Sequence, residues 1–208
     1  KKQNMSLKNL NVTTKIPKVL NNNLKNKIID RIYKRFEKRL NISENFIVAV
    51  SGGPDSLALA FLAKIYSIKK NLIVKFLIVN HKLRPESTKE AKKVQNILKK
   101  YSINSKILNW VGKKPNKNVQ SNARKKRYEL LFAESDRFKI NNILLGHHQD
   151  DLFENFFIRM LRGSGLKGLI SLDKENKIDS KNLLRPLIYE KKEDLVFIAN
   201  KVFNFYVE

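Results

Sequence analysis

Short, almost wholly apolar segments alternate with longer amphipathic segments along most of this chain, and this alternation restricts the possible fold more than any other feature. The apolar segments predict strands at residues 46–50, 72–80, 105–110 and 142–146. Helical periodicity predicts a helix before the first strand and a helix after each strand. Strands that are apolar on both faces and alternate with helices indicate a parallel sheet covered on both sides. We therefore expect an α/β fold, a doubly wound, Rossmann-like parallel sheet with helices on both faces.

The remaining segments complete this expected organisation. Residues 1–22 are rich in lysine and asparagine and are expected to form a flexible basic lead, whereas residues 23–208 are expected to form one domain. Pro186 favours an extended conformation at Arg185, so the segment 182–189 is expected to be extended. The expected helices are 24–40, one from about residue 56, 85–101, 119–138, 150–162 and 191–205.

The first strand ends in the turn SGGPDS, residues 51–56. Ligands of doubly wound sheets bind beyond the carboxyl ends of the strands, which is where this turn lies. Two glycines allow a tight turn whose N–H groups form an anion-binding nest, and the following helix adds partial positive charge. An ordinary capped turn is the alternative, but the order of strand, turn and helix favours phosphate binding. The expected phosphate contacts are Ser51, Gly52, Gly53, Pro54, Asp55 and Ser56.

Asp55 is an acid inside a turn that otherwise suits anions. A carboxylate beside phosphates is repelled unless a cation lies between them. Asp55 therefore predicts that Mg²⁺ bridges this carboxylate and a bound polyphosphate.

Polar side chains also follow the other predicted strands. His81 and Arg84 come directly after the second strand and are expected at the same sheet edge as the SGGPDS turn. Arg124 and Arg127 are three residues apart, so they share one helical face that can meet phosphate or developing negative charge. A loop with scattered polar groups and a solvated basic face are the respective alternatives.

The stretch LLGHHQDDLFENFFIRMLRGSG is the densest group of such residues. His147 ends a strand, while Asp150, Asp151 and Glu154 open the next helix, where acids can also serve simply as helix caps. A zinc site is one alternative, but the two adjacent histidines lack the i, i+4 spacing of helical zinc ligands. We therefore expect this cluster to contact Mg²⁺ and substrate.

Charge and composition narrow the class of partner. The chain has 43 Lys+Arg against 19 Asp+Glu, a net charge of +24, which favours a polyanion such as nucleic acid over a coding bias alone. Arg159 and Arg162 would add a basic edge suited to an RNA backbone or to ATP. The absence of cysteine excludes disulfides and thiolate metal sites and fits a cytoplasmic location. The longest apolar run, residues 57–63, is far too short for a membrane span.

Taken together, the motifs resemble a known family. SGGPDSLAL, VNHKLRPES, QSNARKKRYELL, LLGHHQDDLFENFFIRMLRGSGLKGL and LLRPLI are similar, in order, to motifs of the isoleucine tRNA lysidine synthetases. These are PP-loop enzymes of the N-type ATP pyrophosphatase superfamily, and the resemblance runs from about residue 46 to the end. Gly146, Leu152 and Asn155 stand where the family usually has Ala, Gln and Thr. The family's C-terminal RNA-binding parts have no counterpart here, so we expect them to be missing from this sequence.

The resemblance implies a two-step reaction on the wobble cytidine of the CAU anticodon of isoleucine tRNA. The C2 carbonyl oxygen attacks the α-phosphate of ATP, giving adenylated cytidine and pyrophosphate. The ε-amine of free L-lysine then attacks C2, and AMP leaves. The implied catalytic residues are Asp55, Arg127, His147, Asp150 and Asp151, with Asp55 and Asp151 holding Mg²⁺. The implied substrate and RNA contacts are His81, Arg84, Arg124, Glu154, Arg159 and Arg162.

Other functions remain as alternatives. A tRNA thiolase commonly needs cysteines, which this chain lacks, and amidotransferase-type relatives need a glutaminase domain for which it is too short. An RNA-binding PP-loop module without catalysis is a further alternative, against which the full set of acids and histidines argues. A homodimer is an additional expectation.

Overall fold

The structure is a computed structural model that describes residues 16–112, 115–151, 175–178 and 180–207. The helices are α1 (Lys18–Leu24), α2 (Lys27–Leu40), α3 (Pro54–Lys69), α4 (Ser87–Lys100), α5 (Val119–Phe138) and α8 (Lys192–Phe203). The strands are β1 (Phe46–Val50), β2 (Val74–Asn80), β3 (Ser105–Asn109), β4 (Asn142–Leu144), β5 (Glu175–Ile178) and β6 (Lys181–Leu184). Among these residues no helix is long and apolar enough to cross a membrane.

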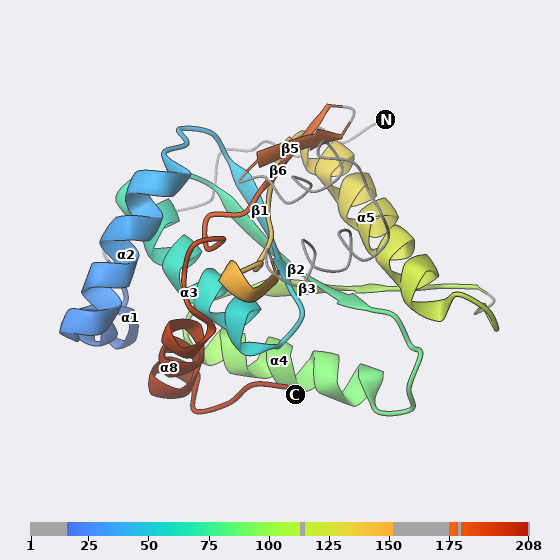
Figure 1. The fold of residues 1–208 in the computed structure, drawn as a ribbon, viewed down its shortest axis with the longest axis horizontal. Coiled ribbons are helices and arrows are strands. Elements are labelled where there is room, and N and C mark those ends of the chain that lie inside the picture. The colour runs from blue at the N-terminus through green and yellow to red at the C-terminus, as the bar shows by residue number, and fades with distance from the viewer. Residues whose placement is uncertain (1–15, 113–114, 152–174, 179, 208) are drawn as a thin grey trace, which may run out of the picture.

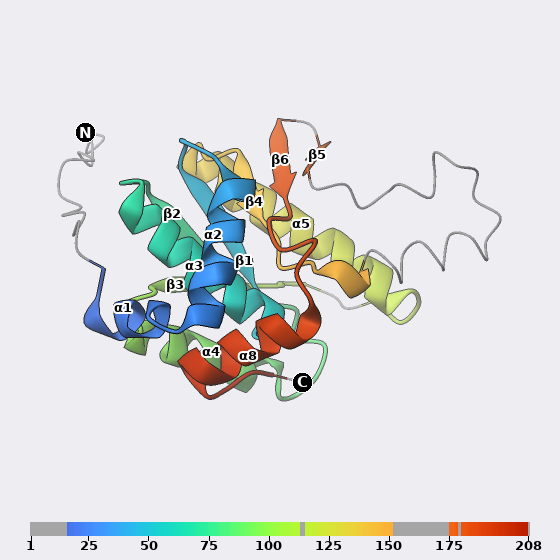
Figure 2. The ribbon, with the colours of Figure 1, turned by 60° about the vertical axis from the view of Figure 1, so that its left-hand side comes forward.

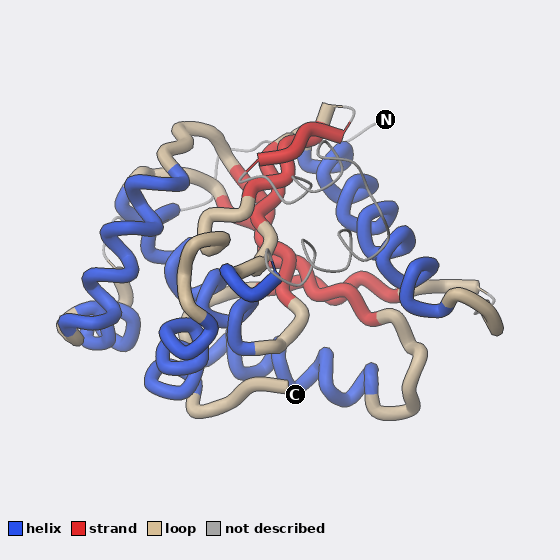
Figure 3. Tube along the Cα trace, in the orientation of Figure 1, coloured by secondary structure: helices blue, strands red, loops and turns tan. Residues whose placement is uncertain are grey.

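In the described part of the chain the strands form one sheet in the order β3-β2-β1-β4-β6-β5. Figure 3 shows the strands in red, with helices in blue on either side. Every neighbouring pair is parallel except the hairpin β5–β6. The chain moves outward from β1 to β3 and then returns to place β4 on the other edge of β1. The topological switch point therefore lies between β1 and β4, where doubly wound sheets bind their ligands.

Helices cover both faces of the sheet (Figures 1 and 2). On one face α3 and α4 pack against the strands, with α2 and α8 packed on α3, and this core includes Phe46, Val48 and Val50 of β1. On the other face lies α5, whose core contains Ile47 of β1. Side chains that alternate along a strand thus enter two separate cores, which explains why the strands read as continuous apolar runs. The predicted doubly wound α/β fold is confirmed.

Two parts of the fold differ from the sequence-based expectation. The expected helix 24–40 begins only at Lys27, as α2, because the Asn26 side chain caps it by accepting the N–H groups of Ile28 (2.9 Å) and Ile29 (3.3 Å), and Leu24 ends the separate α1. Residues 18–22, expected in the basic lead, belong to α1, where Leu20 is fully buried. The segment 182–189 is extended only in its first part, where it forms most of β6, whereas residues 186–189 form a turn. The pairing of β6 with β5 was not expected, since β5 is short and polar.

Candidate functional site

The turn after β1 has the tight backbone that its two glycines predict. Gly52 has a φ of +98°, and Pro54 occupies the first turn of α3. The buried Ser56 hydroxyl accepts N–H groups from Ser51 (3.1 Å) and Gly52 (3.0 Å) and donates to the Gly53 carbonyl (2.9 Å). The Ser56 hydroxyl thus makes its hydrogen bonds within the turn, whereas the Ser51 side chain is exposed. The expected contact between Ser56 and phosphate stays a prediction.

Glycines let other elements approach this turn closely. A Cβ on Gly52 would lie 2.7 Å from Val94 Cγ2 of α4 and 3.1 Å from Val207 Cγ2. The Val207 N–H also donates to the Gly52 carbonyl (2.9 Å), so the segment after α8 covers one side of the turn. A Cβ on Gly146 would lie 3.1 Å from Ser56 Cα, so glycine at this position allows the chain after β4 to lie directly against the start of α3.

Two of the predicted acids meet at one imidazole. His148 Nε2 lies 3.6 Å from Asp55 Oδ2 and 3.7 Å from Asp151 Oδ2. The ring is buried, and its Nδ1 accepts the Asp150 N–H (3.2 Å), while the His148 N–H donates to Asp151 Oδ2 (2.8 Å). Burial raises the pKa of Asp55, and the nearby His148 opposes that rise. His148 thereby draws together the two carboxylates that the sequence proposed as magnesium ligands.

The chemistry of these acids fits a magnesium ion. Asp55 Oδ1 is buried and has no hydrogen-bond partner among the described residues, so one carboxylate oxygen is available to a cation. The described residues contain no preassembled group of three metal-ligating side chains, and Mg²⁺ usually binds through one or two carboxylates plus substrate phosphates. Zinc is a poorer fit, because His147 and His148 bond to different partners.

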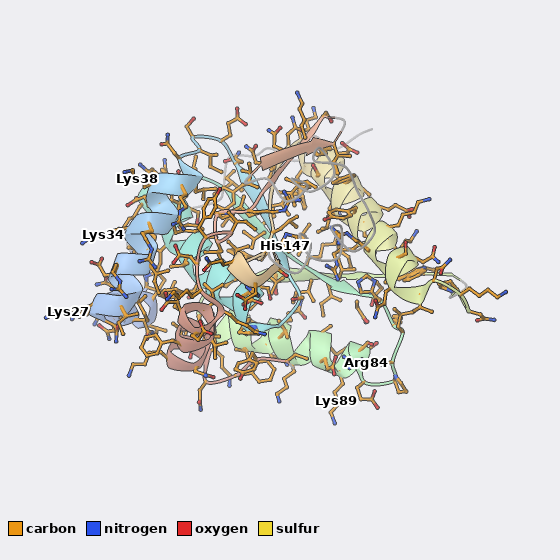
Figure 4. The ribbon with its side chains drawn as sticks, in the orientation of Figure 1. Lys27, Lys34, Lys38, Arg84, Lys89 and His147 are labelled. Atoms are coloured by element: carbon orange, nitrogen blue, oxygen red, sulfur yellow. The ribbon has the colours of Figure 1, made fainter. Side chains whose placement is uncertain are left out.

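A cavity of about 310 Å³ opens beside the turn, at the carboxyl ends of β1 and β2. It brings together residues from four parts of the sequence, including Ser51, His81, Arg84, Arg127 and His147. The Arg84 guanidinium pairs with Glu90 at 3.0 Å, and the His81 ring packs edge-on against Trp110. Figure 4 shows His147 near the middle of the fold and Arg84 beside α4.

His147 is held in one tautomer by a buried arginine. Arg185, 3% exposed, donates its Nε–H to His147 Nδ1 at 3.1 Å. Desolvation lowers the pKa of His147 to about 4, and Arg185, Arg124 and Arg127 add to that effect while Asp151 opposes it. The ring is therefore neutral at pH 7 and carries its proton on Nε2. This makes His147 a hydrogen-bond donor suited to an anionic oxygen and a weak general base.

This arrangement predicts a specific titration. Nitrogen NMR of the His147 imidazole should show the Nε2–H tautomer at pH 7 and a midpoint near pH 4. An unfolded His binds its proton at about pH 6.5. Between these values the unfolded chain binds more protons, so the contribution of His147 to stability is present above pH 6.5 and is lost as the pH falls toward 4. A midpoint near 6.5 would contradict the assignment.

The chain that carries this site matches a known protein family. Residues 21–208 match the family described as the PP-loop domain. The chain belongs to this family. The SGGPDS turn is accordingly its PP-loop, and ATP is the nucleotide that the family implies.

Several curated relatives of this PP-loop domain carry the same name. Proteins named tRNA(Ile)-lysidine synthase from Orientia tsutsugamushi and from the Wolbachia of Brugia malayi are each 42% identical, over 71% and 68% of this chain. One from Rhodopseudomonas palustris is 36% identical over 72% of the chain. The aligned part spans 33%, 33% and 44% of these relatives, so this chain corresponds to between a third and a half of their length.

Solved structures share the fold of this PP-loop domain. The U34-tRNA thiolase NcsA from Methanococcus maripaludis matches with a TM-score of 0.74 at 20% identity, covering 86% of this chain and 66% of that one. The FMN adenylyltransferase of Candida glabrata matches with a TM-score of 0.54 at 14% identity, covering 86% and 62%. At these identities the likeness concerns the fold alone.

The other predicted site residues fall into two groups. Arg124 and Asp150 are exposed near the PP-loop cavity and the acid pair, respectively. The remaining predicted contacts, together with the departures Leu152 and Asn155, lie outside the described residues; these contacts are Glu154, Arg159 and Arg162.

The site predicted from the sequence omitted three residues that the structure places in it. His148, which was not among the predicted site residues, lies between the acids Asp55 and Asp151. Arg185 orients His147, and Lys192 at the start of α8 lowers the pKa of Asp55. The motif LLRPLI was the available signal for Arg185, whereas Lys192 had none.

Proposed function

We propose that this PP-loop domain is the ATP-using part of a tRNA(Ile)-lysidine synthase. The whole protein would ligate free L-lysine to the wobble cytidine of isoleucine tRNA with a CAU anticodon, releasing AMP and pyrophosphate. The observation that carries the proposal is the meeting of Asp55 and Asp151 at His148, directly beside the PP-loop. The names of relatives 42% identical over most of the chain point to the same reaction.

The adenylation step needs stabilisation of negative charge at the phosphates. The N-terminus of α3 and the exposed Ser51 would contact the phosphate chain. Arg127 and the Nε2–H group of His147 line the same cavity and would stabilise charge that develops as the cytidine oxygen attacks. Mg²⁺, held by Asp55 and Asp151, would neutralise phosphate charge when bound.

The second step needs a deprotonated lysine. The amine attacks C2 of the activated base only after its ammonium loses a proton, so a base must lie nearby. Because the His147 Nδ1 accepts the Arg185 Nε–H and its Nε2 carries the proton, this ring has no free lone pair, and we assign the role to the carboxylates of Asp151 and Asp150. The same negative charge would attract the lysine ammonium.

The direct test is incubation of the full-length protein with CAU-bearing isoleucine tRNA, ATP and labelled lysine. We expect lysine in the RNA and one pyrophosphate released for each lysine transferred. An RNA-binding module without catalysis would bind the tRNA without releasing pyrophosphate. That outcome would overturn the proposal.

Asp151→Ala should abolish lysine incorporation while leaving tRNA affinity nearly unchanged. The reason is that this carboxylate lies with Asp55 at the reacting end of the site, whereas a polyanion is bound mainly by basic groups. Lysine transfer and tRNA binding should be measured on the same preparation, with Asp30→Asn on α2 as a surface control. Equal losses of transfer and binding would refute the assignment.

Two further features belong to the same proposal. We place the protein in the cytoplasm, where its RNA, ATP and lysine substrates occur together and where a chain without cysteine needs no oxidising compartment. The homodimer stays a prediction.

A further inference from the structure

Tyr189 is an exposed aromatic side chain on the turn between β6 and α8. Its side chain is 56% exposed, in a domain whose other large apolar groups are mostly buried. The guanidinium carbon of Arg39, from α2, lies 5.4 Å from the centre of the Tyr189 ring. A cation on one part of the ring orients it and leaves the remaining ring surface accessible to a second flat group.

The turn that carries this ring is firmly anchored. The next residue, Glu190, is only 1% exposed, and its carboxylate accepts hydrogen bonds from Arg35 (Nε, 3.1 Å) and from Arg39. The Glu190 carbonyl accepts the N–H of Gln149 at 3.1 Å, and its own N–H donates to Leu187. Because the backbone is held on both sides, the exposed ring is presented in a fixed position at low entropic cost.

The same turn borders the proposed active site. Four residues before Tyr189, Arg185 holds His147; three residues after it, Lys192 acts electrostatically on Asp55. Gln149, which bonds to this turn, lies between His148 and Asp150 in the sequence.

Two exposed lysines follow the ring directly in the chain. They are Lys191 and Lys192, and Glu193 and Asp194 come after them in the first turn of α8. Arg35 pairs with both Glu190 and Asp194, and Arg39 pairs with Glu190, so these arginines offset two of the nearby acids. An aromatic surface with flanking lysines is typical of sites for single-stranded nucleic acid, where bases stack and phosphates pair with cations.

We propose that Tyr189 is a stacking platform for an unpaired RNA base that neighbours the nucleotide undergoing modification, with Lys191 and Lys192 contacting its phosphates. The inference rests on the proposed function, since it takes RNA as the substrate. Stacking on an aromatic ring tolerates any base, so the platform supplies affinity and positioning without reading sequence. Tyr189 is therefore a positioning residue that does not touch the reacting atoms.

The test uses the full-length protein and steady-state kinetics with CAU-bearing tRNA. Tyr189→Ala should raise KM for tRNA roughly 10-fold, with kcat and KM for ATP little changed, which is the size of effect typical of one stacked base. Tyr189→Phe, which keeps the ring, should retain near wild-type KM, whereas Tyr189→Leu should behave like alanine. Lys191→Gln should also raise KM for tRNA, while Lys27→Gln, at the far end of α2, should have a smaller effect (Figure 4).

The outcomes separate this proposal from the proposed function. Wild-type lysine transfer with an unchanged KM in Tyr189→Ala would overturn the platform alone, and so would a Phe variant as impaired as the Ala variant. A lower thermal midpoint in Tyr189→Ala with unchanged KM would show that the ring contacts another part of the protein, which also overturns it. Wild-type protein that transfers no lysine would overturn the proposed function and this inference with it.

Discussion

Alanine in place of Gly52 is expected to abolish ATP binding and to destabilise the domain by about 2–4 kcal/mol. Gly52 has a φ of +98°, a conformation that L side chains rarely adopt. The added methyl group would also lie 2.7 Å from Val94 Cγ2 and 3.1 Å from Val207 Cγ2. Relief of that contact must move α4, the C-terminal segment or the PP-loop itself. Calorimetric titration with ATP and urea unfolding would measure the two effects.

Gly112 provides a matched control for this substitution. Its φ is +102°, close to that of Gly52, but an added Cβ would have no neighbour within 4 Å. Gly112→Ala should therefore cost only the backbone strain, about 1 kcal/mol, and should leave ATP binding intact. If both variants bound ATP equally well, the close packing around Gly52 would have no part in nucleotide binding.

Asp55→Asn is expected to lower pyrophosphate release at least about 100-fold without destabilising the fold. Burial raises the pKa of Asp55, and its Oδ1 has no partner among the described residues. Because the folded state favours the protonated acid, the ionised form costs stability at neutral pH, and this cost fades as the pH falls below the raised pKa. The neutral amide should match or exceed the wild-type free energy of unfolding at pH 7.

The measurement combines tRNA-dependent pyrophosphate release, its dependence on Mg²⁺ concentration, and urea unfolding at pH 7. Asp30→Asn, a surface substitution that removes an ion pair with Lys34 on α2, controls for the loss of one negative charge. An Asp55→Asn protein that is stable and fully active would exclude Asp55 as the magnesium ligand. A strongly destabilised one would show that the carboxylate is structural.

Sequence patterns predicted some helices and strands of this protein and missed others. The strands from β1 to β4 and helix α5 were predicted because an apolar run or a 3.6-residue period is a local property of the chain. The break between α1 and α2 was missed, because the cap at Asn26 interrupts a pattern that otherwise continues. The pairing of β6 with β5 was missed, because β5 gains its pairing from the sheet edge and carries little apolar pattern of its own.

The candidate site shows the same division. The PP-loop could be recognised from one short segment, because its glycines, acid and hydroxyls perform their functions within a single turn. The roles of the two histidines could not be separated in that way. Their neighbours, Arg185 for His147 and Asp55 for His148, are 38 and 93 residues away along the chain.

Local chemistry along the chain was thus enough to indicate the alternating α/β architecture and the phosphate-binding turn, since both depend on residues that are close in sequence. The folded domain alone decided which acids share an imidazole, which arginine sets the His147 tautomer, and that Val207 covers Gly52. The first two contacts arise because the sheet order places the ends of β1, β4 and β6 side by side. The third arises because the segment after α8 lies against the PP-loop. Sheet order is a property of how the strands pack together, and no single segment of the chain encodes it.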